Sequence, residues 1–204
     1  MTRKISTTLR QFRWATLASL ALLAGLSACS QPKHWALQDI NGLMPQLQFN
    51  LTDDAGQAVN ASDYRGKIVL LYFGYTHCPD VCPATLGTLS LALHDLGADA
   101  DKVRVLFVSV DPKRDTTAVL KQYVNAFGPQ FVGLRGTDDQ LESLTKRYRV
   151  AYSRDKPDTQ GNYTVTHSSA VFIFDGEGKS RLLSLSSSKA SEISQDLKRL
   201  ISGA

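Results

Sequence analysis

Continuous apolar runs alternate along this chain with segments of helical spacing. The runs 68–73, 103–110 and 170–174 are apolar at almost every position, which predicts strands that are buried on both faces. Apolar residues spaced by three and four predict a helix that begins between residues 79 and 83, and further helices over 115–127, 137–147 and 189–201. Buried strands that alternate with helices predict an α/β fold, with helices on both faces of a central sheet.

Shorter patterns add edge strands to this sheet. Residues 46–59 alternate polar and apolar positions around a turn at 53–56, which predicts a hairpin. A short strand is predicted at 131–134. Residues 181–185 follow a glycine-rich turn and are predicted to pair antiparallel with the strand 170–174. The stretch 151–163 is polar and predicts a loop or a small hairpin.

The first residues predict an export signal. Four basic residues without an acid precede an apolar run at 14–26, which is shorter than the roughly 20 residues that a membrane-spanning helix needs. The run ends in Leu-Ser-Ala-Cys at 26–29, which resembles the lipobox of bacterial lipoproteins, where the cysteine becomes the lipidated N-terminus. A plain signal peptide with an incidental Cys29 is the alternative.

The chain is therefore expected to have three parts. They are a lipoprotein signal peptide at 1–28, a lipidated N-terminus and tether at 29–45, and one domain at 46–204. His34 and Trp35 are interpreted as surface residues of the tether. Of the 23 basic residues four lie in the signal, which leaves 19 to balance 19 acidic residues. This balance gives no electrostatic case for nucleic-acid binding.

The candidate chemistry lies where the strand 68–73 ends and a helix begins. Cys78 and Cys82 are four residues apart at this junction. On a helix such residues share a face, so both sulfurs are expected to point the same way, with Cα atoms about 6 Å apart. A helix N-terminus stabilises a thiolate, and the pair could bind a soft metal or form a disulfide. Two buried structural cysteines are the alternative.

His167 is the third candidate group. The order of the last elements, with cysteines after an early strand, resembles the thioredoxin-like fold, in which the loop before the strand 170–174 lies beside the cysteine motif. Two thiolates and one imidazole suit Cu(I), whereas a structural zinc site normally has four protein ligands. A histidine that only caps the strand is the alternative. His77 is interpreted as a modulator of the cysteine pKa or a surface residue, and His94 as partly exposed.

Three motifs in order resemble those of the Sco/SenC family. They are GYTHCPDVCP at 74–83, VDPKRDT at 110–116 and VTHS at 165–168. The resemblance covers roughly residues 45–200 and implies a thioredoxin-like α/β fold with a central mixed sheet and helices on both faces. It also implies a membrane-anchored copper chaperone that serves assembly of the CuA site of cytochrome c oxidase.

The resemblance also assigns roles to individual residues. It implies that Cys78, Cys82 and His167 bind Cu(I) or Cu(II) and that the two cysteines form a redox-active pair. It also implies that Asp111, at the end of the neighbouring strand, supports these ligands without binding the metal itself. Thr166 departs from the many members that have Asp before the histidine. The implied partners are the CuA subunit of cytochrome c oxidase, a periplasmic thioredoxin-like reductase or another copper chaperone. The implied location is the periplasmic side of a bacterial membrane, with the lipid on Cys29 as anchor.

Four functions stay open on the sequence alone. The first is a copper metallochaperone, and the second is a thiol-disulfide oxidoreductase that keeps the oxidase cysteines reduced. A peroxiredoxin is disfavoured because Thr76 lies two residues before Cys78, whereas that family places its threonine three before the reactive cysteine. A purely structural lipoprotein would leave the two cysteines and His167 unexplained.

Overall fold

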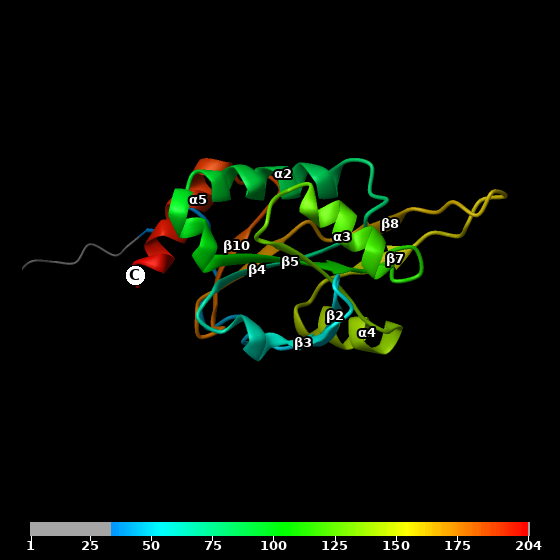
Figure 1. Cartoon of the computed structure of the whole chain (residues 1–204), viewed down its shortest axis with the longest axis horizontal. Helices are drawn as coiled ribbons and strands as arrows, with labels where there is room; N and C mark the ends of the chain where they lie inside the picture. Colours follow the sequence, from blue (N-terminus) through cyan, green and yellow to red (C-terminus); the bar gives the residue numbers. More distant parts are fainter. Residues whose placement is uncertain (1–33, 204) are drawn as a thin grey trace, which may run out of the picture. The chain divides into compact units, whose positions relative to one another are not determined.

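A mixed eight-stranded sheet organises the computed structural model, which describes residues 34–203 (Figure 1). Its strand order is β1-β10-β9-β4-β5-β6-β2-β3. The strands are β1 (Gln38–Asp39), β2 (Asn50–Asp53), β3 (Ala58–Asn60), β4 (Ile68–Gly74), β5 (Val103–Ser109), β6 (Phe131–Arg135), β9 (Val171–Phe174) and β10 (Ser180–Ser184). The three strands β4, β5 and β6 run parallel, and β9 pairs antiparallel with β4.

Helices cover both faces of the sheet. They are α2 (Val81–His94), α3 (Thr117–Asn125), α4 (Asp138–Arg147) and α5 (Ala190–Ile201), with 3-10 turns η1 (Ala61–Tyr64) and η2 (Gly97–Lys102). Figure 1 shows α2, α3 and α5 on one face and α4 on the other. The predicted α/β class, with a mixed sheet between helices, is confirmed.

The two central strands are buried on both faces, as their continuous apolar runs predict. Every residue of β4 is buried, and so is every residue of β5 except Arg104. On the α4 face, the Tyr148 ring packs against Phe73, Phe172 and Phe174. On the opposite face, Tyr72 packs against Phe107 with ring centroids 6.0 Å apart. Successive side chains of a strand point to opposite faces, so β4 contributes to both halves of the core.

Threonine side chains fix the starts of two predicted helices. Thr116 accepts a hydrogen bond from the Val119 amide and caps α3. Thr137 and Gln140 form a capping box at α4, in which each side chain bonds the backbone of the other. Both caps satisfy amides that have no partner inside their helix.

The folded unit begins at Trp35, earlier than the expected boundary at residue 46. Strand β1 pairs with β10, and the Leu37 amide donates to Asp196 Oδ2 of α5 at 2.8 Å. Trp35 is half-buried, and the guanidinium of Arg199 lies 4.3 Å from its ring centroid. The expected tether therefore does not extend past residue 34, and Trp35 is a packing residue. The expected signal peptide and Cys29 lie outside the described residues.

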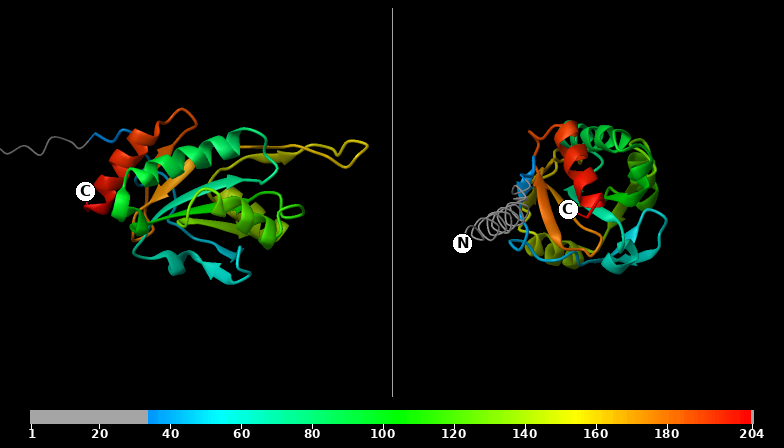
Figure 2. Two further views of the ribbon diagram at one scale, coloured as in Figure 1. Left: turned by 45° about the horizontal axis from the view of Figure 1, so that its top comes forward. Right: turned by 90° about the vertical axis from the view of Figure 1, so that its left-hand side faces the viewer.

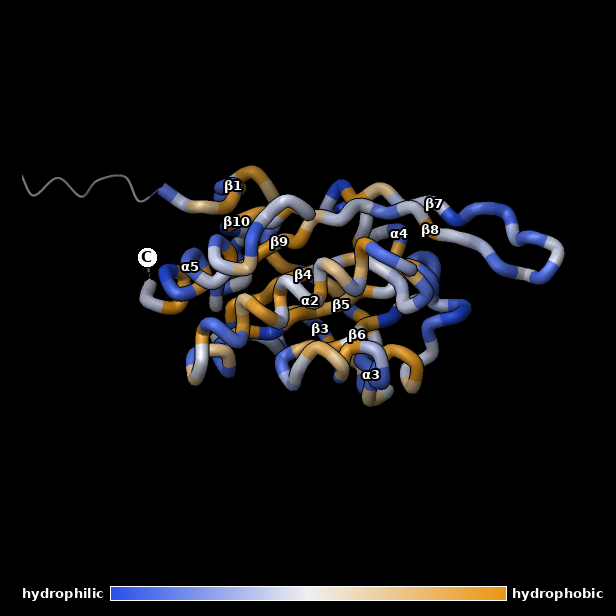
Figure 3. Tube along the Cα trace, turned by 90° about the horizontal axis from the view of Figure 1, so that it is seen from above, coloured by the Kyte–Doolittle hydropathy of each residue, from blue (hydrophilic) through white to orange (hydrophobic). Residues whose placement is uncertain are grey.

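A two-stranded sheet projects beyond the main sheet. It pairs β7 (Tyr152–Arg154) with β8 (Val165–His167), so the polar stretch after residue 150 forms one arm of a hairpin. Figure 2 shows the connection between the two strands extending away from the rest of the fold, and Figure 3 shows that its residues are mainly hydrophilic. In the described part of the chain, no helix has the length and apolar character needed to span a bilayer.

Candidate metal centre

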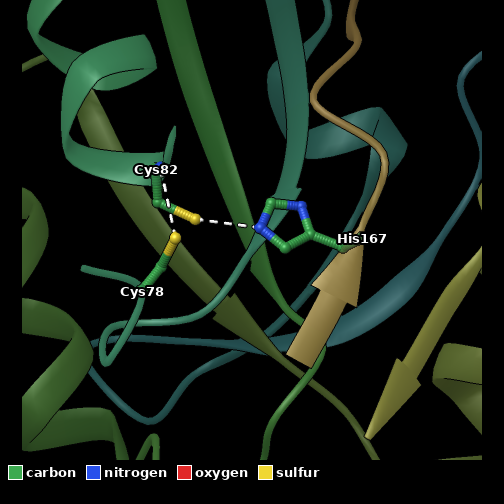
Figure 4. A group of neighbouring side chains, drawn as sticks. All are labelled: Cys78, Cys82 and His167. Carbon is green, nitrogen blue, oxygen red and sulfur yellow. Dashed lines mark hydrogen bonds between the residues drawn. The ribbon is translucent and has the colours of Figure 1, made fainter. Parts of the chain in front are cut away.

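Cys78, Cys82 and His167 meet at the carboxyl end of β4 (Figure 4). Their possible ligand atoms all lie within 4.8 Å of one another. Cys82 Sγ is 3.2 Å from His167 Nε2, and the Cys82 amide donates to Cys78 Sγ at 3.4 Å. The structure thus brings together the three residues that the sequence proposed, from two segments about 85 residues apart.

The position of Cys82 depends on a glycine at the end of β4. A Cβ atom on Gly74 would lie 2.8 Å from Cys82 Sγ and 2.7 Å from Cε2 of Phe107. Only a residue without a side chain lets the first turn of α2 approach the strand this closely. Pro83 is the third residue of α2, where its missing N–H removes no helical hydrogen bond.

Cys78 is not part of the helix, which corrects the expectation that both cysteines share a helical face. The N-cap residue of α2 is Asp80, so Cys78 lies in the turn before it. The Cys78 amide donates to the Tyr75 carbonyl at 3.3 Å, which folds this turn back toward α2. The sulfurs converge because the turn brings Cys78 Sγ to the Cys82 amide at the start of the helix.

The two thiols are in opposite electrostatic environments. Burial tends to raise the pKa of Cys78, but the backbone amides of Asp80, Cys82 and Val81 together outweigh it, and the pKa is lowered. Cys82 has no exposed surface, and burial is the main cause that raises its pKa to about 12. The half-buried Cys78 is therefore the first of the pair to become a thiolate.

His167 is oriented by a backbone hydrogen bond. Its Nδ1 lies 2.9 Å from the Ser168 carbonyl oxygen, which can only accept, so we assign the proton to Nδ1. This tautomer leaves the Nε2 lone pair facing Cys82 Sγ. Metal-ligating histidines are typically oriented in this way, with the other ring nitrogen donating a hydrogen bond to a nearby acceptor. The rings of Tyr72 and Tyr75 meet the imidazole edge-on, with centroids 6.1 and 5.8 Å away.

This donor set fits a soft metal ion. Two thiolates and one imidazole suit Cu(I), which accepts three ligands, while a structural zinc site takes four protein ligands. Within residues 34–203, no other cluster of three or more His, Cys, Asp or Glu ligand atoms is found. His77 and His94 are exposed and lie outside the cluster, in agreement with their interpretation from sequence.

Asp111 lies near the site but does not contact it directly. It is fully buried, accepts a hydrogen bond from the Tyr163 hydroxyl at 2.7 Å, and pairs with Arg114. The Arg114 guanidinium stacks 3.7 Å from the Tyr163 ring centroid and 5.7 Å from that of Tyr75. In the described structure no hydrogen bond joins Asp111 to the two cysteines or His167, so it ties the β7–β8 hairpin to the loop after β5.

A second acid of the same motif, Asp115, contacts the cysteine turn instead. Its carboxylate accepts hydrogen bonds from the amide and hydroxyl of Thr76, two residues before Cys78. Asp115 was not among the residues expected at the site from the sequence. Its place in the motif at 110–116 was the available signal, but the sequence does not show which of the two acids turns toward the cysteines.

The fold and the site define a thioredoxin-like protein with a dithiol and histidine centre. The SCO1/SenC family model matches residues 42–202, and the chain belongs to this family. An SCO2-like protein of Rickettsia felis is 37% identical over 132 residues, which cover 64% of each chain. The chain thus spans about 64% of the length of that curated relative.

Solved structures support the fold. The structure of Bradyrhizobium japonicum ScoI with copper bound has a TM-score of 0.70 and 39% identity, and the match covers 76% of this chain and 98% of that chain. BsSco is more distant, with 20% identity, a TM-score of 0.62 and coverage of 82% and 98%. It is described as a member of the Sco family of cytochrome c oxidase assembly proteins in which a disulfide switch was identified. At that identity, BsSco supports the shared fold alone.

Proposed function

We propose that this protein binds copper through Cys78, Cys82 and His167 and delivers it to, or helps assemble, the CuA site of cytochrome c oxidase. The observation that carries the proposal is the convergence of the three ligand atoms within 4.8 Å in a member of this family. Copper bound to ScoI supports the choice of metal. The resemblance of the three motifs to those of the Sco/SenC family, to which the chain belongs, supports the oxidase as the destination.

The asymmetry of the ligands suits the transfer of a cargo. Cys82 is buried and His167 is half-buried and held by Ser168, so these two ligands retain the ion. Cys78 is half-buried at the surface turn, so a thiolate of a recipient protein can approach the ion from its side. Exchange of the Cys78 thiolate for a thiolate of the recipient then moves the ion without releasing free copper into water.

We propose further that the protein is anchored by lipid on Cys29 at the periplasmic side of a bacterial membrane. The support is the resemblance of residues 26–29 to a lipobox. One acyl chain binds membranes only marginally, whereas a bacterial lipoprotein carries several. Cys29→Ala is expected to block processing or to release the protein from the membrane fraction. Wild-type protein in the soluble fraction would indicate a plain signal peptide.

A thiol-disulfide oxidoreductase is the alternative function, and the split thiol pKa values favour it. The Cys78 thiolate would attack a disulfide of a partner and form a mixed disulfide, with one partner sulfur leaving as a thiolate. Cys82 would then lose its proton, attack Cys78 Sγ and release the second partner sulfur. The partner gains two electrons, and Cys78 and Cys82 become a disulfide. A separate reductant, such as a periplasmic thioredoxin-like protein, must restore them.

Copper titration of reduced wild-type protein and site variants tests the copper site. We expect one copper per protein, lost in Cys78→Ser and in Cys82→Ser. His167→Ala is expected to retain some Cu(I) on two thiolates but to lose stable Cu(II), which prefers nitrogen and oxygen ligands. The thiols of His167→Ala should still form a disulfide, because the imidazole takes no part in that bond.

His94→Ala is the matched control, because His94 is an exposed histidine outside the cluster. It should titrate like the wild type in Cu(II) absorption and in thiol count after mild oxidation. Full Cu(II) absorption in His167→Ala would contradict the three-ligand site. Undiminished copper in either serine variant would contradict the copper proposal itself and leave the dithiol function.

A further inference from the structure

A buried carboxylate lies beneath the turn that carries Cys78. Asp115 has no exposed surface. Its Oδ1 accepts from the Thr76 hydroxyl at 2.7 Å, and its Oδ2 accepts from the Thr76 amide at 3.1 Å and from the Ser109 hydroxyl at 2.6 Å. A buried carboxylate is costly unless hydrogen bonds replace its water, and these three bonds do so. Two of the three come from one residue, Thr76.

Thr76 connects this carboxylate to the metal centre. The next residues in the turn are His77 and Cys78, and the Cys78 amide closes the turn on the Tyr75 carbonyl. Fixing Thr76 therefore fixes the base of the turn, on which Cys78 Sγ is brought to the Cys82 amide. The imidazole of His77 faces outward, half-exposed, with Nδ1 3.1 Å from Thr76 Oγ1 and 3.7 Å from Asp115 Oδ1.

Asp115 itself is firmly held by elements outside the turn. Its amide donates to the Asp111 carbonyl at 3.0 Å, and the next residue, Thr116, is the N-cap of α3. Ser109 is the last residue of β5 and pairs in register with Gly74 at the end of β4. The carboxylate thus joins the cysteine turn to two rigid elements of the fold.

We propose that Asp115 is a positioning residue for Cys78, acting through the two hydrogen bonds to Thr76. The inference rests on the proposed copper-binding function. A ligand on a surface turn must be ordered before it can complete a metal site, and the free energy of that ordering is lost from binding. By ordering the turn in the metal-free protein, Asp115 places Cys78 Sγ beside Cys82 and His167 before the ion arrives.

Three substitutions around the carboxylate test this inference while Asp115 stays in place. Thr76→Val keeps the shape of the side chain but removes the hydroxyl bond to Asp115. Thr76→Ser keeps the hydroxyl and is the conservative rescue. Ser109→Ala is the matched control, because it removes a bond to the same carboxylate and a bond from the Asp111 amide, but none to the turn.

Two measurements are made on each variant. Competition with a Cu(I) chelator gives the copper affinity, and hydrogen exchange of the reduced, metal-free protein reports the order of residues 75–82. Thr76→Val is expected to bind Cu(I) about tenfold more weakly, as for loss of a hydrogen bond to a charged group, and to exchange faster in this turn. Thr76→Ser and Ser109→Ala are expected to stay within about twofold of the wild type in affinity.

Two results would overturn the inference. If Ser109→Ala lowers the affinity as much as Thr76→Val, then Asp115 supports the fold generally and does not position Cys78. If Thr76→Val matches the wild type in both measurements, the bond to Thr76 has no role in the site. Absence of copper binding in the wild type contradicts the proposed function instead, and the exchange data then decide by themselves whether Asp115 orders the turn.

Discussion

The turn that carries Cys78 and the first turn of α2 that carries Cys82 differ although only three residues separate the two cysteines. The Cys78 turn is at the surface and is shaped by backbone hydrogen bonds and by Asp115. Cys82 is sealed between α2 and β4, with Gly74 and Phe107 against it. Amides at the start of the helix lower the pKa of Cys78, and burial raises that of Cys82.

This difference shows how one short motif can supply two ligands of different character. A helix N-terminus concentrates unpaired amides, but they stabilise only the sulfur that lies outside the helix and in front of it. The sulfur inside the first turn points toward the sheet and loses water without gaining those amides. The spacing of four residues therefore produces one reactive thiol and one protected thiol.

The largest expected effect is on the rate of alkylation of the two thiols. In reduced, metal-free protein at pH 7.5, iodoacetamide should modify Cys78 at least about a hundredfold faster than Cys82, because only a thiolate reacts and Cys82 is both buried and protonated. Peptide mapping by mass spectrometry measures both rates. Unfolding in guanidinium chloride is the control and should make the rates similar. Equal rates in the folded protein would contradict the opposite environments of the two thiols.

A smaller effect is expected from closing the space that Gly74 leaves for Cys82. Gly74→Ala places a methyl group within 2.8 Å of Cys82 Sγ, so the first turn of α2 must shift. Overpacking of this kind costs about 1–3 kcal/mol of unfolding free energy, and the shift should weaken copper binding as well. Urea denaturation of the metal-free protein measures the first effect.

Gly87→Ala is the matched control for this substitution. Gly87 lies inside α2, and a Cβ there would meet no atom within 4 Å. Alanine should therefore stabilise the helix by about 0.5–1 kcal/mol and leave copper binding unchanged. A Gly74→Ala variant as stable as Gly87→Ala would show that the contact between β4 and Cys82 is loose.

The smallest expected effect is on the pH dependence of stability. Cys78→Ser keeps only the raised pKa of Cys82, so its unfolded state loses a proton near pH 9 that the folded state retains until about pH 12. Its unfolding free energy should fall by roughly 1 kcal/mol more between pH 8 and 10 than that of Cys82→Ser, because the tyrosines with raised pKa values are common to both variants. Cys82→Ser keeps only the lowered pKa of Cys78, so this additional loss should be absent. Denaturation of both variants at several pH values checks the sign, and parallel curves would contradict it.

Local sequence patterns predicted most of the fold and the two cysteines of the candidate metal centre. The strand and helix periods identified the strands of the sheet and the helices that cover it, because these features depend on neighbours within one or two turns. His167 was found through the resemblance of its motif and its place before β9. Such signals lie within a few residues of the features that they predict.

Features that depend on contacts between distant segments were missed. The packing of Trp35 and Leu37 depends on Arg199 and Asp196 of α5, about 160 residues later, and nothing in residues 29–45 indicates it. Whether Asp111 or Asp115 contacts the turn that carries Cys78 depends on how the loop after β5 turns toward Thr76. The position of Cys78 ahead of α2 depends on where the helix begins, and a sequence places such boundaries only to within a few residues.

The contacts of Trp35 and Leu37 with α5 determine at which end of the domain the chain enters it. In Figures 1 and 2 the chain enters the domain at the end where α5 finishes, whereas α2 begins, and β4 and β8 finish, at the opposite end. Six residue steps separate Cys29 from Trp35, a reach of at most about 22 Å. If Cys29 is lipidated as proposed, a segment this short would keep the end of the domain that contains Trp35 near the bilayer. The copper ligands would then lie at the end of the domain farthest from the bilayer. A recipient site would have to project from the membrane by about the length of the domain to reach them.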